Sequence, residues 1–293
     1  MSTLYLVATP VGNLGDLSPR ALETLKNADL ILAEDTRVTR KLLNAFEIST
    51  PLESCHQHNE RQKAGQIIER MSKENLNVAL VSDAGTPAVS DPGAIVVALA
   101  NAAGIPVISV PGPSAVILAL SKSGFPQTEF TFYGFLPRKK RELIEKLESM
   151  KGKAKLAVLY ESPHRVLSLL EAINEVFPDS RVSVSRELTK LHEQTLTGQV
   201  KDILNRFSSD EGLLRGEFAL VLEVPETEND QAETAPDLSL EARIMDLMAK
   251  GHSFRDAKAA LITNGHKKNA VYAAGLNLKK LAENLLDKDG AQE

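Results

Sequence analysis

The sequence predicts an α/β protein with two α/β domains and a small helical domain at its C-terminal end. The chain has 293 residues, enough for about two domains of roughly 150 residues each. Short apolar segments alternate with helical patterns as far as about residue 224, and this alternation is typical of sheets covered by helices. Beyond it, an acidic stretch leads into a basic segment with three short helical patterns.

The composition is that of an ordinary globular protein, with 43% hydrophobic and 25% charged residues. Cys55 is the single cysteine, so no disulfide can form within the chain, and the cytosol is the expected compartment. The N-terminal residues lack a basic region and reach a proline and a glycine early, so no signal peptide is expected. The uncharged stretch 92–121 contains Gly104, Pro106 and Pro111, which argues against a membrane span.

Residues 1–122 are predicted to form the first α/β domain. Its expected strands are 4–8, 30–33, 77–81 and 105–110. Its expected helices are 36–46, 59–73 and 94–103, with a further one after Pro113. Another helix should begin at Ser18-Pro19, because serine is a favoured N-cap and proline is favoured at the first helical position. The strands are apolar along nearly their whole length, which indicates a largely parallel sheet buried on both faces.

The segment Ser123-Gly124-Phe125-Pro126 is interpreted as a domain joint, and residues 123–224 as the second α/β domain. The strands expected there are 130–133, 156–160, 181–185, 193–197 and 218–224. The helices expected there are 139–150, one opened by Ser162-Pro163, and 200–207. Residues 225–238 are predicted to be an acidic linker. Residues 239–293 are predicted to be a small helical domain, with helices at 240–249, 254–263 and about 269–278.

Three turns rich in glycine, proline and small polar residues directly follow predicted parallel strands. They are ATPVGN (Ala8–Asn13), SDAGTPAVSDPG (Ser82–Gly93) and PGPSA (Pro111–Ala115). In an open α/β sheet, ligands bind beyond the carboxyl ends of the strands, and glycine lets the backbone approach a ligand closely. Three such turns at one edge favour a ligand site over simple tight connections. The Walker A and G-x-G-x-x-G sequences are both absent, which argues against a dehydrogenase.

Two polar segments of the first domain allow more than one interpretation. Glu34 and Asp35 end a predicted strand. They either meet a cationic or hydroxyl-bearing ligand, or Asp35 caps the following helix. Cys55, His56 and His58 suggest a metal site, but no second Cys/His pair accompanies them. A polar patch on the substrate side is therefore favoured there, and no metal is expected.

In the second domain, residue types that carry chemistry again follow apolar strands. The segments are FYGFLP (Phe132–Pro137), YESPHR (Tyr160–Arg165) and RELTK (Arg186–Lys190). Their charged residues form either a solvated salt-bridge face or one wall of a cleft that faces the first domain. Their position directly after strands favours the cleft.

With these motifs in this order, the chain resembles the tetrapyrrole-methylase superfamily, the class III S-adenosylmethionine-dependent methyltransferases. The matching motifs are TPVGNLGDLSPRALETL, AEDTR, HQHNE, VSDAGTPAVSDPG, PGPSA, FYGFLP, YESPHR, RELTK and GEFALVLE. The resemblance implies a homodimer in which S-adenosylmethionine binds in the cleft between two α/β domains. Carried onto this sequence, it implies cofactor contacts at Pro10, Gly85, Thr86, Pro87, Val89, Ser114, Ala115, Glu161, Leu188 and Ala219.

Within the superfamily, the chain is most similar to the branch that methylates a cytidine 2′-oxygen in 16S ribosomal RNA of the small subunit. Members that act on tetrapyrroles carry Gly-Asp-Pro where this chain has Gly85-Thr86-Pro87, and a glycine-rich first loop where it has Thr9–Asn13. This departure favours the RNA branch over methylation of a tetrapyrrole or a protein side chain. A non-catalytic ribosome-assembly or RNA-binding factor on the same fold stays an alternative.

Methylation of a ribose hydroxyl requires a group that takes up the hydroxyl proton and a group that stabilises negative charge on the oxygen. The candidates are Glu187 and Lys190 on one wall of the cleft, with Asp35, Arg37 and Asn59 on the other. This chemistry requires no metal.

The charge distribution bears on an RNA partner. The net charge of −5 argues against broad electrostatic coating of a nucleic acid. Residues 223–240 hold six acids and no base, whereas residues 241–280 hold eight basic and three acidic residues. The basic residues form either the solvated face of a helical bundle or an RNA-docking surface. The segment Gly265–Asn269 resembles the turn of a helix-turn-helix.

Overall fold

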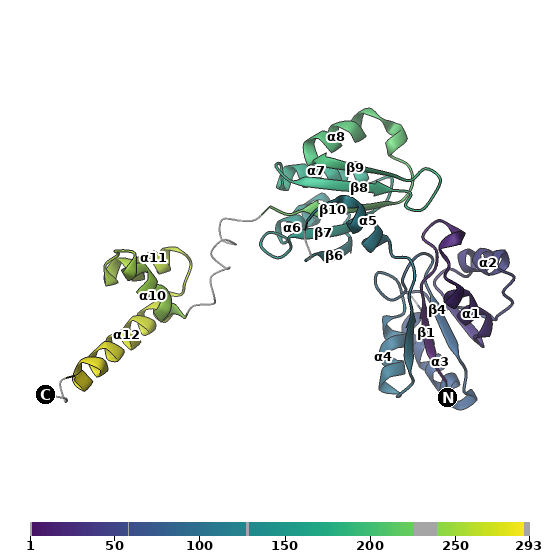
Figure 1. The fold of residues 1–293 in the computed structure, drawn as a ribbon, viewed down its shortest axis with the longest axis horizontal. Coiled ribbons are helices and arrows are strands. Elements are labelled where there is room, and N and C mark those ends of the chain that lie inside the picture. The colour runs from purple at the N-terminus through teal and green to yellow at the C-terminus, as the bar shows by residue number, and fades with distance from the viewer. Residues whose placement is uncertain (1, 58, 127–128, 226–238, 290–293) are drawn as a thin grey trace. The chain divides into compact units, whose positions relative to one another are not determined.

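The computed structural model describes residues 2–57, 59–126, 129–225 and 239–289. The chain divides into two compact units, Met1–Pro225 and Glu226–Glu293, and each is described by itself (Figure 1).

Unit 1 begins with a five-stranded parallel sheet in the order β3-β2-β4-β1-β5. Its strands are β1 (Leu4–Val7), β2 (Leu30–Ala33), β3 (Leu52–Ser54), β4 (Val78–Val81) and β5 (Val107–Val110). Its helices are α1 (Pro19–Asn27), α2 (Thr36–Ala45), α3 (Glu60–Glu74) and α4 (Ala94–Ala102), and the short 3-10 helix η1 (Leu14–Asp16) precedes α1. As predicted, Ser18 caps α1 by accepting a hydrogen bond from the amide of Ala21.

Helices cover both faces of this sheet (Figure 1). Successive residues of a strand point to opposite faces. Leu32 of β2 therefore lies in the core that contains Ile67 of α3 and Val96 of α4. Ile31 lies in the core that contains Leu25 of α1 and residues of α2. The prediction of a parallel sheet buried on both faces is confirmed.

The second sheet of unit 1 has the strand order β6-β7-β10-β8-β9. Its strands are β6 (Thr131–Phe135), β7 (Leu156–Glu161), β8 (Arg181–Arg186), β9 (Gln194–Gln199) and β10 (Phe218–Glu223). β6 and β7 run parallel, and the other neighbouring strands run antiparallel. One face is covered by α6 (Lys140–Glu148), α7 (Val166–Val176) and α8 (Val200–Ser209), and the 3-10 helix η2 (Glu211–Leu213) follows α8.

The other face of the second sheet is covered by α5 (Ala115–Ser123). Val116 and Ala119 of α5 pack in one core with Val158 of β7 and Val221 of β10. This helix lies almost wholly before the expected domain boundary at residue 122, yet its packing belongs to the second sheet. The turn between β5 and α5 therefore connects the two sheets directly.

Apart from the two short 3-10 helices, which were not predicted, three elements differ from the sequence predictions by more than two residues at an end. β3 was not expected, because three half-buried residues are too few to show a period. α7 begins at Val166 rather than at Ser162, since residues 163–165 first form a turn. α12 (Lys268–Asp289) continues past the expected end at 278, where leucine, alanine, lysine and glutamate, all strong helix formers, follow one another.

Unit 2 contains α10 (Leu240–Ala249), α11 (Phe254–Thr263) and α12, as the sequence predicted for its helical domain. Ile244, Ala257, Leu261, Val271 and Ala274 form its core. Of the predicted linker, residues 226–238 lie outside the described residues. Among the helices that the structure describes, none combines the length and the apolar character needed to cross a bilayer.

Candidate functional site

Three turns at the carboxyl edge of the first sheet are in contact with one another. Thr9, after β1, exchanges two backbone hydrogen bonds with Gly85, after β4, at 2.9 and 3.0 Å. The Thr9 hydroxyl also donates to the carbonyl oxygen of Ser82 at 3.0 Å. The hydroxyl of Thr86 donates to the carbonyl oxygen of Pro113 at 3.3 Å. The structure thus brings together the three turns that follow β1, β4 and β5.

Glycine is required at two points where these turns meet. Gly85 has a φ of +79°, a left-handed conformation that side chains rarely adopt. A Cβ atom on Gly112 would lie 2.8 Å from the Cβ of Ala8, which is closer than two carbon atoms can pack without a shift of the backbone. A larger residue would strain the backbone at position 85 and would push the turns apart at position 112.

A cavity of about 490 Å³, here called the cofactor cavity, lies where these turns meet the second sheet. From the first sheet and its turns it is lined by Val11, Glu34, Asp83, Ala84, Ser90, Asp91 and, at the start of α5, Ala115. From the second sheet and its loops it is lined by Phe135, Tyr160, Glu161, Ser162, Pro163, Leu188, Glu217, Phe218 and Ala219. Its volume lies in the range of small-molecule sites, roughly 300–1,000 Å³.

Three carboxyl groups from the first domain, Glu34, Asp83 and Asp91, line this cavity. Burial, together with the nearby carboxylates of Asp91 and Asp83, raises the pKa of Glu34 to about 7. Burial also raises the pKa of Asp83 and of Asp91. A cation in the cavity would relieve the repulsion among these groups and favour their charged forms. The first domain therefore contributes a wall suited to a positively charged group.

The wall from the second sheet is largely apolar. Tyr160 contacts Phe132 and Phe135 edge-on, with ring centroids 5.0 and 5.7 Å apart. Burial raises the pKa of Tyr160 to about 12, so the phenol keeps its proton at neutral pH. Leu188 and Ala219 are buried beside it. Such a wall suits the flat face of a nucleobase.

These two walls fit the cofactor that the motifs imply, since S-adenosylmethionine combines an adenosine with a sulfonium cation. Of the expected cofactor residues, the cavity is lined by Ala115, Glu161, Leu188 and Ala219. The others lie in the adjoining turns and outside this lining, namely Pro10, Gly85, Thr86, Pro87, Val89 and Ser114.

Lys190 lies between two carboxylates. Neither Lys190 nor Glu187 lines the cavity, but they flank Leu188, and Lys190 pairs with Glu217, both of which do, and in this sense they lie at its rim. Lys190 Nζ donates to Glu187 Oε1 at 2.9 Å and to Glu217 Oε2 at 3.0 Å. Burial opposes the charge of both Glu187 and Lys190, but the hydrogen bonds outweigh it, so the pKa of Glu187 is lowered and that of Lys190 is raised. Both are therefore ionised. A Cβ atom on Gly12 would overlap the Lys190 side chain, so the turn after β1 packs directly on this lysine.

The loop that carries Glu187 and Lys190 has an unusual backbone. Glu187 and Thr189 have positive φ values of 50° and 67°, which cost about 1–3 kcal/mol each in residues other than glycine. The backbone amide of Glu187 donates to Glu217 O at 3.1 Å, and that of Thr189 donates to Glu193 Oε2 at 2.6 Å. Such backbone strain is typical of functional sites.

Asp35, Arg37 and Asn59 are placed differently from Glu187 and Lys190. Asp35 Oδ1 accepts from the amide of Arg37 at 2.8 Å and so caps α2, which was the alternative interpretation of this acid. The hydrogen bonds from Arg37 lower the pKa of Asp35 to about 2. Asn59 Oδ1 accepts from the amide of His56 at 2.8 Å and holds the turn before α3. Like Glu187 and Lys190, none of the three lines the cofactor cavity, and a catalytic role for them stays a prediction.

The segment from Cys55 to Asn59 is built around a core residue. Cys55 is buried in the core of the first sheet, and burial raises the pKa of its thiol to about 11. His58 lies outside the described residues. Within the described part of the chain, no group of three or more His, Cys, Asp or Glu residues is arranged to hold a metal ion.

Glu34 lines the cavity, in line with the sequence interpretation that the Glu34-Asp35 pair meets a cationic or hydroxyl-bearing ligand. Several other residues of the site were not among the candidates from the sequence: Asp83, Asp91, Tyr160 and Glu217. All of them lie in motifs that the sequence singled out, and Glu217 belongs to the GEFALVLE motif. Glu217 precedes β10 and reaches the site only because β10 pairs with β7 and β8.

Glu60 ends the HQHNE motif but was not among the candidate site residues from the sequence. Its buried Oε1 accepts from the amides of Gly93 and Ile95 at 2.9 and 2.8 Å. A side chain of α3 therefore caps the N-terminus of α4. It fixes the end of the turn that carries Asp83 and Asp91.

Comparison with known proteins agrees with this architecture. The model of the family described as Tetrapyrrole (Corrin/Porphyrin) Methylases matches residues 3–204. A relative from Bacillus subtilis (strain 168), named Ribosomal RNA small subunit methyltransferase I, is 40% identical over 277 residues, which are 94% of each chain. A relative of the same name from Synechocystis sp. is 44% identical over 252 residues, which are 86% of this chain and 88% of the relative.

Solved structures share the fold at lower sequence identity. A diphthine synthase aligns with a TM-score of 0.59 and 14% identity, over 80% of this chain and 94% of its own. A uroporphyrin-III-C-methyltransferase from Thermus thermophilus aligns with a TM-score of 0.53 and 23% identity, over 75% of this chain and 93% of its own.

Proposed function

The chain belongs to the tetrapyrrole (corrin/porphyrin) methylase family, and from this we propose that it transfers a methyl group from S-adenosylmethionine to 16S ribosomal RNA of the small subunit. The observation that carries the proposal is its similarity to small-subunit ribosomal RNA methyltransferases along nearly the whole chain, at 40% identity over 94% of both sequences. The cofactor cavity supports it, because its charged and apolar walls fit S-adenosylmethionine.

We propose a cytidine ribose 2′-oxygen as the acceptor, as the sequence motifs imply. When bound, the cofactor supplies an electrophilic methyl group. The chain must then orient the hydroxyl group and accept its proton. Glu34 suits proton transfer, because a pKa of about 7 leaves a substantial carboxylate fraction at neutral pH.

Glu187 and Lys190 are proposed to act at the rim, where the ionised lysine is held by two carboxylates. There Lys190 can stabilise negative charge that develops on the ribose oxygen. Asp35, Arg37 and Asn59 also stay proposed catalytic residues, and their polar groups, like those of Glu187 and Lys190, are engaged in local contacts.

The proposal is tested by mass-spectrometric mapping of ribose methylation in ribosomal RNA from cells with and without this gene. A methylated cytidine of the 16S RNA should be lost in the deletion strain and restored by the purified chain with S-adenosylmethionine. Unchanged RNA methylation would contradict the proposal. It would leave a substrate of another class, a tetrapyrrole or a protein side chain, or a non-catalytic role in ribosome assembly.

We propose a homodimer as the working form and the cytoplasm as its location, where the ribosomal RNA substrate is found. β5 is an edge strand of the first sheet, and edge strands can pair with another chain. Leu99 of α4, Ile108 of β5 and Ile117 of α5 are large apolar side chains exposed in the single chain. Light scattering of the purified protein measures its oligomeric state.

A further inference from the structure

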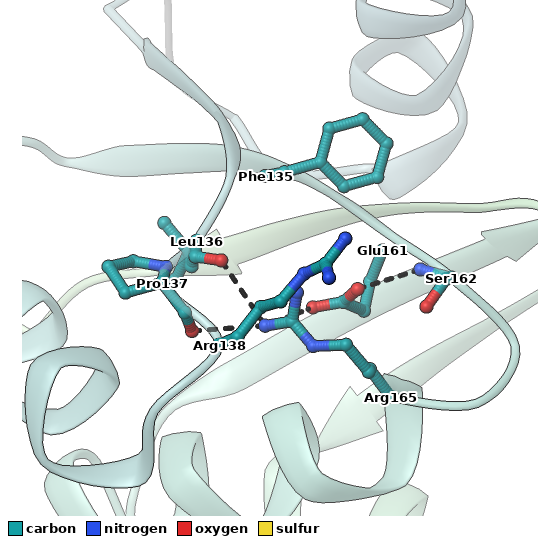
Figure 2. Close-up of a pocket in the computed structure, with 7 residues that line it drawn as sticks. All are labelled: Phe135, Leu136, Pro137, Arg138, Glu161, Ser162 and Arg165. Atoms are coloured by element: carbon teal, nitrogen blue, oxygen red, sulfur yellow. Dashed lines mark hydrogen bonds and ion pairs between the residues drawn. The ribbon is translucent and has the colours of Figure 1, made fainter.

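A second cavity, of about 400 Å³, adjoins the cofactor cavity (Figure 2). The two share Phe135, Glu161 and Ser162 as lining residues. We propose that the second cavity is a subsite for an RNA nucleotide beside the methylated one, in which Phe135 stacks on the base and Arg138 binds a phosphate. This inference rests on the proposed function, because it names how the same site would hold its RNA.

The floor of the second cavity is held by hydrogen bonds and one ion pair. Arg165 Nη2 donates to the carbonyl oxygens of Leu136 and Pro137 at 3.2 and 3.0 Å. It also pairs with Glu161 Oε2 at 3.2 Å, and the side chain of Glu161 is fully buried. Glu161 Oε1 accepts from the amide of Ser162 at 2.8 Å (Figure 2). Arg165 therefore shapes the cavity, and its charge is balanced by Glu161.

Arg138 is the charged group of this cavity that is available to a ligand. It is exposed, and it makes no hydrogen bond or ion pair with any residue that the structure describes. In Figure 2 the Arg138 side chain extends from the turn after Pro137 toward the Phe135 ring. No dashed line joins it to another of the residues drawn. A planar guanidinium with several donors matches two oxygens of one phosphate.

The backbone of β6 presents Phe135 beside this guanidinium. The pairing of β6 with β7 shifts register between Phe132 and Gly134, and Gly134 has a φ of +65°. In a regular strand Phe132 and Phe135 would point to opposite faces, but here both contact Tyr160. The bulge thus turns Phe135 toward the cofactor cavity, as bulges near active sites often do. Its side chain stays 61% exposed, which leaves a ring available for stacking.

The two cavities carry net charges of opposite sign, so one favours a cationic ligand and the other a phosphate. The cofactor cavity carries Glu34, Asp83 and Asp91, which repel a phosphate and attract a sulfonium cation. In the second cavity the charges of Arg165 and Glu161 balance each other, and Arg138 leaves a net positive charge. A nucleotide can therefore place its phosphate at Arg138 while its neighbour's ribose reaches the cofactor cavity.

The test measures binding of a fluorescein-labelled, single-stranded oligocytidylate RNA to the full chain by fluorescence anisotropy at several KCl concentrations. Arg138→Ala should weaken binding about tenfold at low salt. It should also reduce the slope of log K against log salt by about 0.7, the value for one phosphate contact on a single strand. Phe135→Leu should weaken binding about tenfold with the slope unchanged, and Phe135→Tyr should retain the affinity because its ring still stacks.

Arg141→Ala is the matched control. Arg141 lies on α6, its side chain is 88% exposed, and it pairs only locally with Glu145 among the described residues. Removal of this arginine makes the same change in net charge outside the cavity, and the RNA affinity and its salt slope should stay unchanged. Calorimetry should show that Arg138→Ala binds S-adenosylmethionine as the unmodified chain does, which establishes that the variant is folded.

Several results would contradict the proposal of a nucleotide subsite. These are no RNA binding by the unmodified chain, an unchanged salt slope in Arg138→Ala, an equal loss in Arg141→Ala, or unchanged affinity in Phe135→Leu. If cytidine monophosphate requires Arg138 but the oligonucleotide does not, the cavity is a site for free nucleotides and the inference is wrong. The binding assay involves no methyl transfer, so its outcome is separate from that of the RNA methylation test.

Discussion

At the scale of single residues, the ionisation of Glu34 should govern how the cofactor cavity receives a cation. Burial and the neighbouring Asp91 and Asp83 raise its pKa to about 7. As the pH rises through about 7, Glu34 becomes a carboxylate and attracts the sulfonium group. We expect the affinity for S-adenosylmethionine to be about tenfold higher at alkaline than at acidic pH. This corresponds to a decrease of about one unit in the pKa of Glu34 when the cofactor binds.

Isothermal titration across this pH range checks the expectation. Glu34→Gln should remove most of the pH dependence. S-adenosylhomocysteine, which lacks the sulfonium charge, should show a smaller dependence than S-adenosylmethionine on the unmodified chain. Equal pH profiles for Glu34→Gln and the unmodified chain would exclude Glu34 as the titrating group.

The same shift affects the free energy of unfolding. Because the folded-state pKa of Glu34 lies above its ordinary value of 4.5, the stabilisation linked to its protonated form is complete below about pH 4.5. It is lost as the pH rises through about 7. Relative to the unmodified chain, Glu34→Gln should therefore become more stable with rising pH in urea unfolding.

Gly12 should matter through its contact with Lys190. An added Cβ would overlap the lysine side chain, so Gly12→Ala should displace Lys190 from Glu187 and Glu217. We expect methyl transfer to fall roughly tenfold, which is about 1.4 kcal/mol of transition-state stabilisation. Lys190→Ala should have a comparable effect, and the double variant should be no worse than Lys190→Ala alone, because both act on one interaction.

Gly65→Ala is the control for this substitution. Gly65 lies within α3, and a Cβ added there would meet nothing within 4 Å. Its transfer rate should stay unchanged. Additive losses in the Gly12/Lys190 double variant would show that Gly12 acts by another route.

At the scale of the elements, the N-terminus of α4 depends on Glu60 of α3. Glu60→Ala leaves the amides of Gly93 and Ile95 without their acceptor, and we expect a loss of about 2 kcal/mol in the free energy of unfolding. Glu60→Gln retains an oxygen acceptor and should lose less. Urea unfolding of the two variants measures the difference.

The Glu60→Ala substitution should also weaken cofactor binding. The turn that ends at Gly93 carries Asp91 and Asp83 of the cofactor cavity, so its loosening misplaces two carboxylates. Calorimetry with S-adenosylmethionine should show lower affinity for Glu60→Ala than for Glu60→Gln. A stability loss without any change in affinity would limit Glu60 to a structural role.

At the scale of the whole molecule, unit 2 is predicted to dock on ribosomal RNA. α11 and α12 are joined by a short turn with Gly265 at a φ of +91°, and Lys267 and Lys268 in and after this turn are exposed. Removal of the chain after Pro236 should leave cofactor affinity intact, because the cavity lies wholly in unit 1. It should weaken binding to small ribosomal subunits, most clearly at moderate salt.

Replacement of Lys267 and Lys268 together by uncharged residues should reduce the slope of log K against log salt for subunit binding by up to about two. This is about one for each phosphate contact that is lost. Lys250→Ala is a control, since Lys250 already pairs with Asp246 at 2.7 Å. If the truncated chain binds and methylates subunits as well as the full chain does, unit 2 has a structural or regulatory role.

The sequence by itself determined most of the helices and strands of the fold. Leu30–Ala33, Leu240–Ala249 and Phe254–Thr263 have the predicted bounds, because apolar periodicity, N-caps and turn residues act within a few neighbours along the chain. The three turns of the cofactor cavity were predictable for the same reason, since each directly follows its own strand. The short β3 and the bulge at Gly134 were not, because they depend on pairing with another strand.

Only the tertiary structure decided which side chains meet. The contact of Gly12 with Lys190, the cap of α4 by Glu60, and the packing of α5 on the second sheet all join residues far apart in the chain. The pKa of Glu34 likewise depends on Asp83 and Asp91, which lie about 50 residues away in sequence and affect it through space and shared burial. Motifs place such residues at the edges of the sheets, but burial and distance assign their charges and partners, and these arise only when strands and helices far apart in the chain pack together.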